Sequence, residues 1–227
     1  MENALDNTTD SDQESDSNGE ASLMAQRFRG YLPVVMDIET GGFNAETDAV
    51  LEIAAAILAM NDDGELVIKR SLSYHVEPFP GANLDPSALE FTGIDPYHPL
   101  RPSQPEEEVL RSLFKEIRAE MKLVGCKKSI IAAHNAVFDQ GFLSAATERC
   151  AIKRNPFHPF SSFDTATLAG LAVGQTVLAR ACHVAGISFD SASAHSAHYD
   201  ALKTAELFCA IVNRWKALGG WPPPVSQ

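Results

Sequence analysis

Two acids separated by one residue lie in the first apolar run of the chain. Asp37 and Glu39 flank Ile38 in the segment Val-Met-Asp-Ile-Glu-Thr. Side chains at positions i and i+2 of a strand point to the same face, so the two residues would lie about 7 Å apart at the backbone. Their mutual repulsion is costly unless a cation lies between them. The pair predicts a metal site, although two solvated acids at an exposed strand end fit this segment equally well.

Two later segments each place an acid near the beginning of an expected helix. Asp139 ends the block His134-Asn-Ala-Val-Phe-Asp139, directly after an apolar run, and Asp200 ends the block His195-Ser-Ala-His-Tyr-Asp200. Taken alone, Asp139 is explained by the favourable charge of an acid at a helix N-terminus. A lone histidine such as His195 is more often a surface residue than a base.

Taken together, the three segments indicate phosphodiester hydrolysis. Carboxylates at strand and helix ends suit hard cations such as Mg²⁺ or Mn²⁺. Two such ions about 3.5–4 Å apart could stabilise both the attacking and the leaving oxygen of a phosphodiester. His195 precedes the helix that carries Asp200, and a nearby imidazole could take a proton from the attacking water.

Apolar periodicity predicts the elements that must position these residues. Strands are expected over residues 33–38, 50–60, 66–75 and 129–133, and the second and third are joined by the turn Asn61-Asp-Asp-Gly64. Helices are expected over residues 105–124, 140–150, 175–185 and 197–218, the last with Leu202, Ala205, Phe208, Val212 and Trp215 on its inner side. Strands first and helices interleaved later predict an α/β domain with a mixed central sheet flanked by helices.

Composition is compatible with one enzyme domain of this kind. The 227 residues are 45% hydrophobic, which is enough for a single buried core. The net charge of −12 is concentrated, because residues 1–20 hold seven acids and no base, and the rest of the chain carries only −5. Two divalent ions would bring that part close to neutrality, so a polyanionic substrate is not excluded.

The ends and the cysteines predict a cytoplasmic protein. The Ser-, Asp- and Glu-rich start predicts a disordered acidic tail over residues 1–26, and residues 222–227 form a short C-terminal tail. The chain has neither an apolar run long enough to cross a membrane nor a secretory signal. Its four cysteines lack zinc or disulfide spacing (Cys126, Cys150, Cys182 and Cys209).

The three acidic blocks resemble the motifs of the DEDDh exonuclease superfamily, in the same order and with wide separations. Flanking segments narrow the likeness to the ribonuclease T family over residues 27–221; they include Arg27-Phe-Arg-Gly30, Gly41-Gly-Phe43-Asn, His75-Val-Glu-Pro-Phe79, Gly93-Ile-Asp-Pro96 and Asn213-Arg-Trp-Lys216. The resemblance implies a ribonuclease H-like fold in a homodimer. It also implies a 3′→5′ exonuclease that trims transfer RNA and other stable RNAs, releases nucleoside 5′-monophosphates and degrades single-stranded DNA as well.

The resemblance also implies a role for particular residues. The metal ligands are Asp37, Glu39, Asp139 and Asp200, and His195 is the general base. Terminal bases stack on four phenylalanines, a contact that suits single strands (Phe43, Phe91, Phe138 and Phe160). Phosphates are expected to meet basic residues that gather into strips, among them Arg27, Arg29, Lys122 and Lys128. Ser87 stands where the family leads one to expect an acid, so discrimination between terminal bases does not carry over.

Two alternatives stay open at this stage. The motifs alone fit a DNA proofreading or repair exonuclease equally well, and only the flanking segments favour RNA. A non-catalytic nucleic-acid-binding scaffold is the other, but a decayed nuclease would lack an acid or the histidine, and all five are present.

Overall fold

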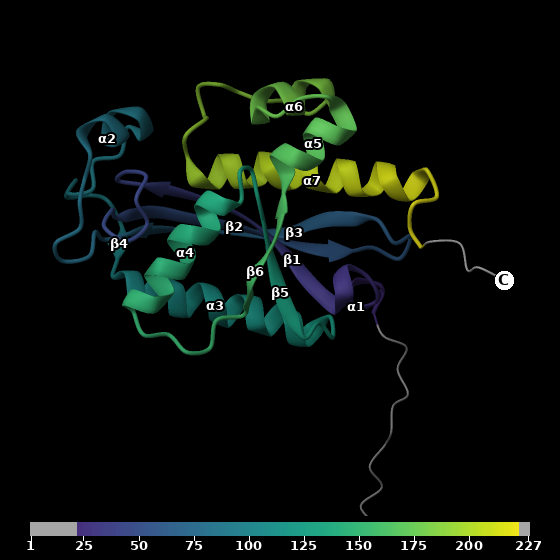
Figure 1. The fold of residues 1–227 in the computed structure, drawn as a ribbon, viewed down its shortest axis with the longest axis horizontal. Coiled ribbons are helices and arrows are strands. Elements are labelled where there is room, and N and C mark those ends of the chain that lie inside the picture. The colour runs from purple at the N-terminus through teal and green to yellow at the C-terminus, as the bar shows by residue number, and fades with distance from the viewer. Residues whose placement is uncertain (1–21, 223–227) are drawn as a thin grey trace, which may run out of the picture.

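A six-stranded mixed sheet forms the centre of the computed structural model, which describes residues 22–222 (Figure 1). The strand order is β4-β3-β2-β1-β5-β6. The pairs β1/β2 and β2/β3 are antiparallel, whereas β1/β5, β5/β6 and β3/β4 are parallel. The strands are β1 Tyr31–Thr40, β2 Val50–Met60, β3 Leu66–Val76, β4 Ser103–Gln104, β5 Lys128–Ala133 and β6 Phe157–Asp164.

Strand β1 is central because its residues suit burial on both faces. Val34, Val35 and Met36 have no exposed surface, as expected for a strand between two neighbours with helices on both sides. The β2/β3 hairpin closes at Asn61, whose side chain accepts the N–H of Glu65 at 2.8 Å. The predicted strands and their turn are confirmed.

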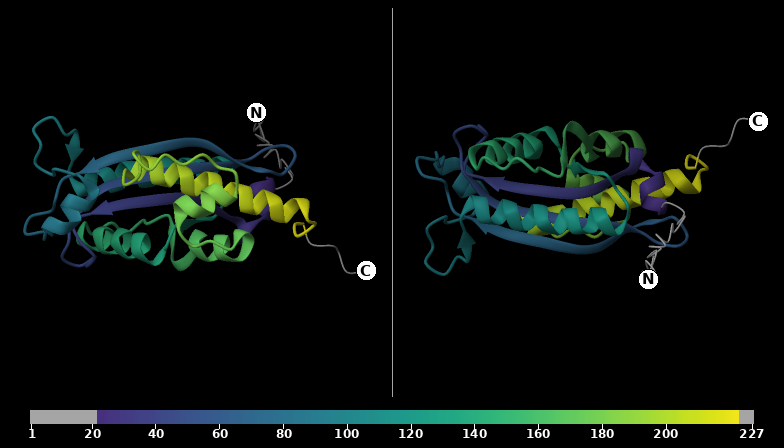
Figure 2. Two further views of the ribbon diagram at one scale, coloured as in Figure 1. Left: turned by 90° about the horizontal axis from the view of Figure 1, so that it is seen from above. Right: turned by 90° about the horizontal axis from the view of Figure 1, so that it is seen from below.

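Helices cover both faces of the sheet (Figures 1 and 2). The long helix α7 lies across β1, β2 and β3, with α5 and α6 beside it, and α3 covers the opposite face next to α4. The helices are α1 Leu23–Gln26, α2 Pro86–Thr92, α3 Glu106–Leu123, α4 Val137–Arg149, α5 Thr165–Val173, α6 Leu178–Val184 and α7 Ala197–Ala217, with a 3-10 turn η1 at Phe28–Gly30.

The predictions for α3 and α7 are confirmed, apart from one residue of the apolar face of α7. Phe208 and Val212 are buried, but Trp215 is 59% exposed, so its placement on the inner side was wrong. Helix α7 stays bound to the sheet as far as Asn213, whose side chain forms two hydrogen bonds with the backbone of Leu66 at the beginning of β3, and Trp215 lies beyond this contact.

Other boundaries shift for local reasons. Helix α4 begins at Val137, three residues before the predicted start, and includes Asp139 in its first turn. The helix predicted over residues 175–185 covers only Leu178–Val184, because Gly174 ends α5 in a left-handed conformation and the chain must turn before α6. Strand β6 and helices α2 and α5 were not predicted.

The ordered domain begins before residue 27. Ser22 caps α1 by accepting the N–H of Ala25, and Met24 is 2% exposed, so Leu23–Gln26 belongs to the domain and not to the predicted tail. The remainder of that tail and residues 223–227 lie outside the described residues. Among residues 22–222, no helix is both long enough and apolar enough to cross a membrane.

Candidate active site

Three of the predicted acids converge where β1 ends. Asp37 and Glu39 project from the same face of β1, and Asp200 reaches them from the first turn of α7. One carboxylate oxygen of each residue lies within 4.8 Å of the other two. Asp37 and Asp200, which are far apart along the chain, thus belong to one cluster, as a shared metal site requires.

Small side chains bring α7 close enough to complete this cluster. Ala197 and Ala201 pack on Ala54 of β2, and all three are at most 1% exposed. Ala54 is the cross-strand partner of Asp37. Larger residues at these positions would push the helix away from the sheet, because a packed interface does not accommodate extra volume without displacement.

Asp139 lies beside the three-acid cluster and is held by the backbone. Its Oδ1 accepts the N–H of Ile38 at 3.0 Å, and the residue is 4% exposed. Its charge acts on Asp37, but no oxygen of Asp139 belongs to the group that lies within 4.8 Å. The structure therefore brings all four acids to one region, three of them within ligand distance of each other.

Burial raises the pKa values of all four acids, and mutual repulsion raises three of them further. Burial is the largest cause in each case, and neighbouring carboxylates add to it at Asp37, Glu39 and Asp139. The pKa of Glu39 rises to about 7 and that of Asp139 to about 8, while the pKa of Asp37 is raised well above its usual value. The ionised cluster is thus unfavourable without a counterion.

The donor set fits hard divalent cations. Within residues 22–222, none of the four acids forms an ion pair with lysine, arginine or histidine. Asp200 Oδ1 is buried and has no hydrogen-bond partner in that part of the chain, whereas its Oδ2 accepts the N–H of His195. Clustered carboxylate oxygens that lack a protein cation suit Mg²⁺ or Mn²⁺.

His195 is exposed beside the cluster in an unusual backbone conformation. Its φ of +67° lies in the left-handed region, and its N–H donates to Asp200 Oδ2 at 2.9 Å. Its ring lies 4.2 Å from that of Phe91, measured between centroids. Non-glycine residues in this conformation occur preferentially at functional sites. The backbone of the predicted base is therefore tied to a predicted metal ligand, while its imidazole lies against Phe91.

An aromatic pocket of about 530 Å³ opens next to Glu39. Three of the four predicted phenylalanines line it, namely Phe43, Phe91 and Phe138. Phe43 is 86% exposed, whereas Phe138 is half-buried and packs on Phe142. Rings beside a carboxylate centre can hold a base while its phosphate reaches the acids.

The other two residues singled out for substrate contact are placed differently. Ser87 lines the aromatic pocket, and its hydroxyl donates to Asp85 at 2.7 Å. Phe160 is 81% exposed on β6, stacks edge-on against His158 and does not line the pocket. Its contact with substrate stays a prediction.

One predicted basic residue is not at the surface. Arg27 is only 6% exposed, and its guanidinium lies over the rings of Phe28 and Trp221, so burial lowers its pKa. Arg27 thus does not belong to the exposed basic strip predicted for it. Arg29 is exposed. Tyr31, two residues further along the chain, is the register partner of Lys128 on the neighbouring strand β5.

A second group of cations includes Arg111 and Arg118, which the sequence interpretation missed. Arg118 and Arg154 line a hollow of about 310 Å³ together with Arg111 and Lys153. Arg118 donates to the carbonyl oxygen of Arg154 at 2.9 Å, so the hollow is held by a direct contact. Helical spacing could have revealed part of this group, because Arg111, Arg118 and Lys122 share one face of α3.

We predict that divalent ions remove a pH-dependent loss of stability. The acids have raised pKa values in the folded state, so the folded protein holds more protons than the unfolded chain between about pH 4 and pH 8. Stability therefore falls as pH rises through this window. In EDTA the melting temperature should decrease from pH 5 to pH 8, and Mg²⁺ should raise it by several degrees at pH 8 but little at pH 5.

Asp37→Asn is the matched variant for this experiment. Removal of one charge should raise the melting temperature in EDTA at pH 8 and greatly reduce the shift produced by Mg²⁺. A flat pH profile of the wild-type protein in EDTA would contradict the repulsion that we infer.

Removal of a pocket ring should weaken binding of a single-stranded 3′ end. Stacking contributes about 1–3 kcal/mol per base, so Phe91→Ala should raise KM by about tenfold or more. Tyr97→Ala removes another exposed aromatic ring, which does not line the pocket, and should leave KM within about twofold. Steady-state kinetics on a short oligonucleotide provide the measurement, and equal effects of the two variants would remove Phe91 from substrate binding.

Known proteins resemble this chain over most of its length. A family model described as exonuclease, RNase_T, matches residues 34–208. Ribonuclease T of Hahella chejuensis is 61% identical over 204 residues, which cover 90% of this chain and 94% of that protein. Ribonuclease T of Yersinia enterocolitica is 59% identical over 206 residues, with 91% and 96% covered.

Solved structures support the same fold. E. coli exonuclease I in complex with a dT13 oligonucleotide superposes with a TM-score of 0.62 at 18% identity, covering 84% of this chain and 43% of that one. The predicted ribonuclease H-like exonuclease fold is thereby confirmed. With relatives of about 60% identity along nearly its whole length, the chain belongs to the ribonuclease T family of exonucleases and is a nuclease that hydrolyses nucleic acid.

Proposed function

We propose that this protein is a Mg²⁺-dependent 3′→5′ exoribonuclease that trims the ends of transfer RNA and other stable RNAs, and that Mn²⁺ can replace Mg²⁺. One observation carries the proposal: the carboxylate cluster lies directly beside a pocket lined by exposed rings, and Glu39 belongs to both. An unpaired terminal nucleotide has both groups that this arrangement recognises, a base and a phosphodiester.

The acids would hold the divalent ions. Asp37, Glu39 and Asp200 offer clustered oxygens, and Asp139 offers the oxygen that does not accept from Ile38. When bound, divalent ions stabilise negative charge on the phosphodiester and lower the pKa of water. The relief of repulsion among the acids favours their binding.

The remaining residues orient the substrate and move the proton. Phe43 and Phe91 hold the terminal base, which keeps the last phosphodiester near the acids. The imidazole of His195 takes the proton from the water that attacks the phosphorus. The bond from phosphorus to the 3′ oxygen of the preceding nucleotide breaks, and that oxygen takes a proton from solvent water. A nucleoside 5′-monophosphate leaves, and the shortened strand ends in a 3′ hydroxyl.

RNA is the favoured substrate class, and single-stranded DNA is a second one. The similar proteins that span nearly the whole chain are named ribonuclease T, which supports RNA. The similarly folded exonuclease I was solved with a dT13 oligonucleotide, which fits DNA as an additional substrate. The DNA proofreading or repair alternative predicts the opposite preference. A scaffold without catalysis is disfavoured, since the acids and His195 lie together.

Phosphates of the RNA would meet the exposed cations. Lys122 and Lys128 retain their predicted role, and Arg118 and Arg154 of the basic hollow join them. This hollow and Asp139 lie at opposite ends of α4, about 15–20 Å apart by helical rise. In a homodimer the basic surface of one chain would guide RNA to the active centre of the other, as the family resemblance implies.

An exposed apolar groove supports the homodimer. Its volume is about 660 Å³, and it includes Leu171, Trp215 and Leu218, which are 88%, 59% and 73% exposed. Contiguous apolar surface of this kind marks interaction sites. A second copy of the chain is the occupant that we propose, and this contact would cover the exposed end of α7.

The substrate assignment predicts a clear outcome with end-labelled RNA. The wild-type protein should shorten a tRNA with extra 3′ nucleotides in Mg²⁺ but not in EDTA, and should act more slowly on a DNA oligonucleotide of matched sequence. His195→Ala should lower kcat by at least about a hundredfold while RNA binding in EDTA is retained. Activity in EDTA, or a preference for DNA, would contradict the proposal.

The basic hollow predicts a change in salt dependence. Loss of one phosphate contact reduces the slope of log K against log salt by about 0.7–0.9. Arg118→Ala should weaken tRNA binding and reduce the slope by this amount. Arg111→Ala is the matched control, because that guanidinium is already paired with Glu107 at 2.6 Å, and its slope should change less. Filter binding in EDTA measures both.

A further inference from the structure

A fifth carboxylate lies next to the cluster and has no part in the mechanism described above. Glu52 on β2 is the direct cross-strand partner of Glu39, and its side chain is 14% exposed. Like charges directly opposite each other destabilise a sheet. An acid at this position therefore requires compensating interactions.

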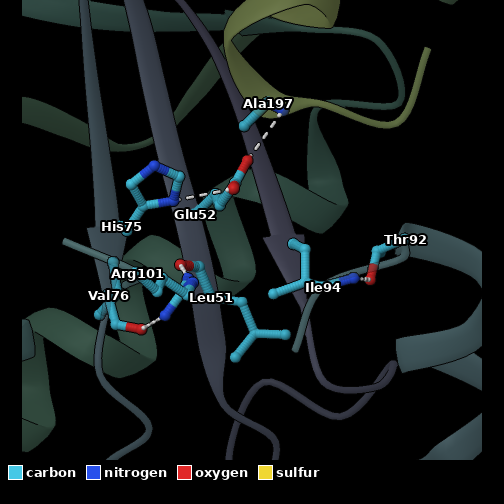
Figure 3. A network of polar contacts seen from close by, with 8 residues as sticks. All are labelled: Leu51, Glu52, His75, Val76, Thr92, Ile94, Arg101 and Ala197. Carbon is cyan, nitrogen blue, oxygen red and sulfur yellow. Dashed lines mark hydrogen bonds and ion pairs between the residues drawn. The ribbon is translucent and has the colours of Figure 1, made fainter. Parts of the chain in front are cut away.

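Both carboxylate oxygens of Glu52 have partners from other elements (Figure 3). Oε2 accepts the N–H of Ala197, the first residue of α7, at 3.4 Å. Oε1 lies 2.9 Å from Nδ1 of His75, the residue opposite Glu52 on β3. The contact with His75 is close but not aligned as a hydrogen bond. Glu52 thus joins β2 and β3 to the beginning of α7.

The two strands are fixed to each other at this same level. Arg101 donates to the carbonyl oxygen of Val76 at 3.0 Å and also to that of Leu51. These residues are the sequence neighbours of His75 and Glu52. The carboxylate of Glu52 therefore projects from a part of the sheet in which β2 and β3 are held together by the segment that carries Arg101.

Helix α7 lacks a cap of its own. Ser196 stands at the N-cap position, but its side chain makes no capping hydrogen bond. The first N–H groups of a helix have no partner within the helix, and negative charge near them is favourable. Glu52 supplies both the acceptor and the charge from a distant strand. A second contact, between Ser71 Oγ and His198 Nε2 at 2.9 Å, joins the same turn to β3.

We infer that Glu52 is a positioning residue that holds the first turn of α7 in register with the carboxylates of β1. Ala197 comes two residues after His195 and three before Asp200. The alanine contact with Ala54 fixes how closely the helix approaches the sheet, but small side chains do not prevent sliding along it. At the first turn of α7 the hydrogen bond to Glu52, together with the contact between Ser71 and His198, fixes that remaining direction and thereby places both functional residues.

The role in turnover rests on the proposed exonuclease mechanism, so the test includes a readout that does not need activity. Glu52→Ala should lower kcat on a single-stranded RNA oligonucleotide by about tenfold or more with KM within about twofold, because misplaced catalytic groups impair chemistry before binding. Hydrogen exchange of the peptide covering residues 195–202 should become faster, and that of the other helices should not.

Glu52→Gln and Glu116→Ala are the matched variants. The amide side chain introduced by Glu52→Gln retains an oxygen that can accept the N–H of Ala197, so this variant should recover most of the kcat and the slow exchange. Glu116→Ala breaks a comparable contact with β3, the 2.9 Å ion pair with Arg70, and should change neither readout.

Three results would overturn the inference: wild-type kcat and exchange in Glu52→Ala, equal damage in Glu52→Ala and Glu52→Gln, or faster exchange throughout the protein. If the wild-type protein proved inactive on RNA, the exchange measurement would still decide whether Glu52 holds α7. Failure of the proposed function is thus distinguishable from failure of the positioning role.

Discussion

Repulsion among buried carboxylates governs the architecture around the end of β1. Burial and mutual charge raise the pKa of Asp37, Glu39 and Asp139, and none of them pairs with a basic side chain among the described residues. Such a cluster disperses unless rigid elements hold it together. The fully buried interior of β1 and the alanine contact between α7 and β2 provide this rigidity. The repulsion is relieved when divalent ions bind, so the same arrangement that costs stability creates affinity for cations.

The site divides into a rigid half and an exposed half. The acids belong to a buried strand and to the first turns of packed helices, whereas His195, Phe43 and Phe91 lie on loops or at the surface. Hydrolysis of a phosphodiester requires accurately placed charges. Stacking of a terminal base on aromatic rings tolerates small movements of those rings. A hydrogen bond connects the two halves: the N–H of His195 donates to the carboxylate of Asp200. In the proposed reaction, a substrate held by the rings would therefore meet a centre that needs little rearrangement.

The elements with strong periodicity were predictable, and those without it were not. β1, the β2/β3 hairpin, α3 and α7 have clear apolar patterns, turn residues or helix-start signals. β6 contains Pro159 and exposed residues, and α5 is a run of small apolar residues with no polar face, so neither has a period that local reasoning detects. Trp215 matched the apolar face of α7 but is exposed, because packing around the end of the helix leaves its ring uncovered, and periodicity does not record packing.

The sequence by itself indicated which side chains are candidates for the chemistry, because acids at strand and helix ends and a histidine before a helix occur together in the order of the family motifs. Only the tertiary structure decided how they meet. Asp139 bonds to Ile38 beside the three-acid cluster, and the buried Arg27 packs against the ring of Trp221. Glu52 caps a helix 145 residues away. Contacts of this kind join residues that are distant along the chain, and the spacing of residue types contains no record of them.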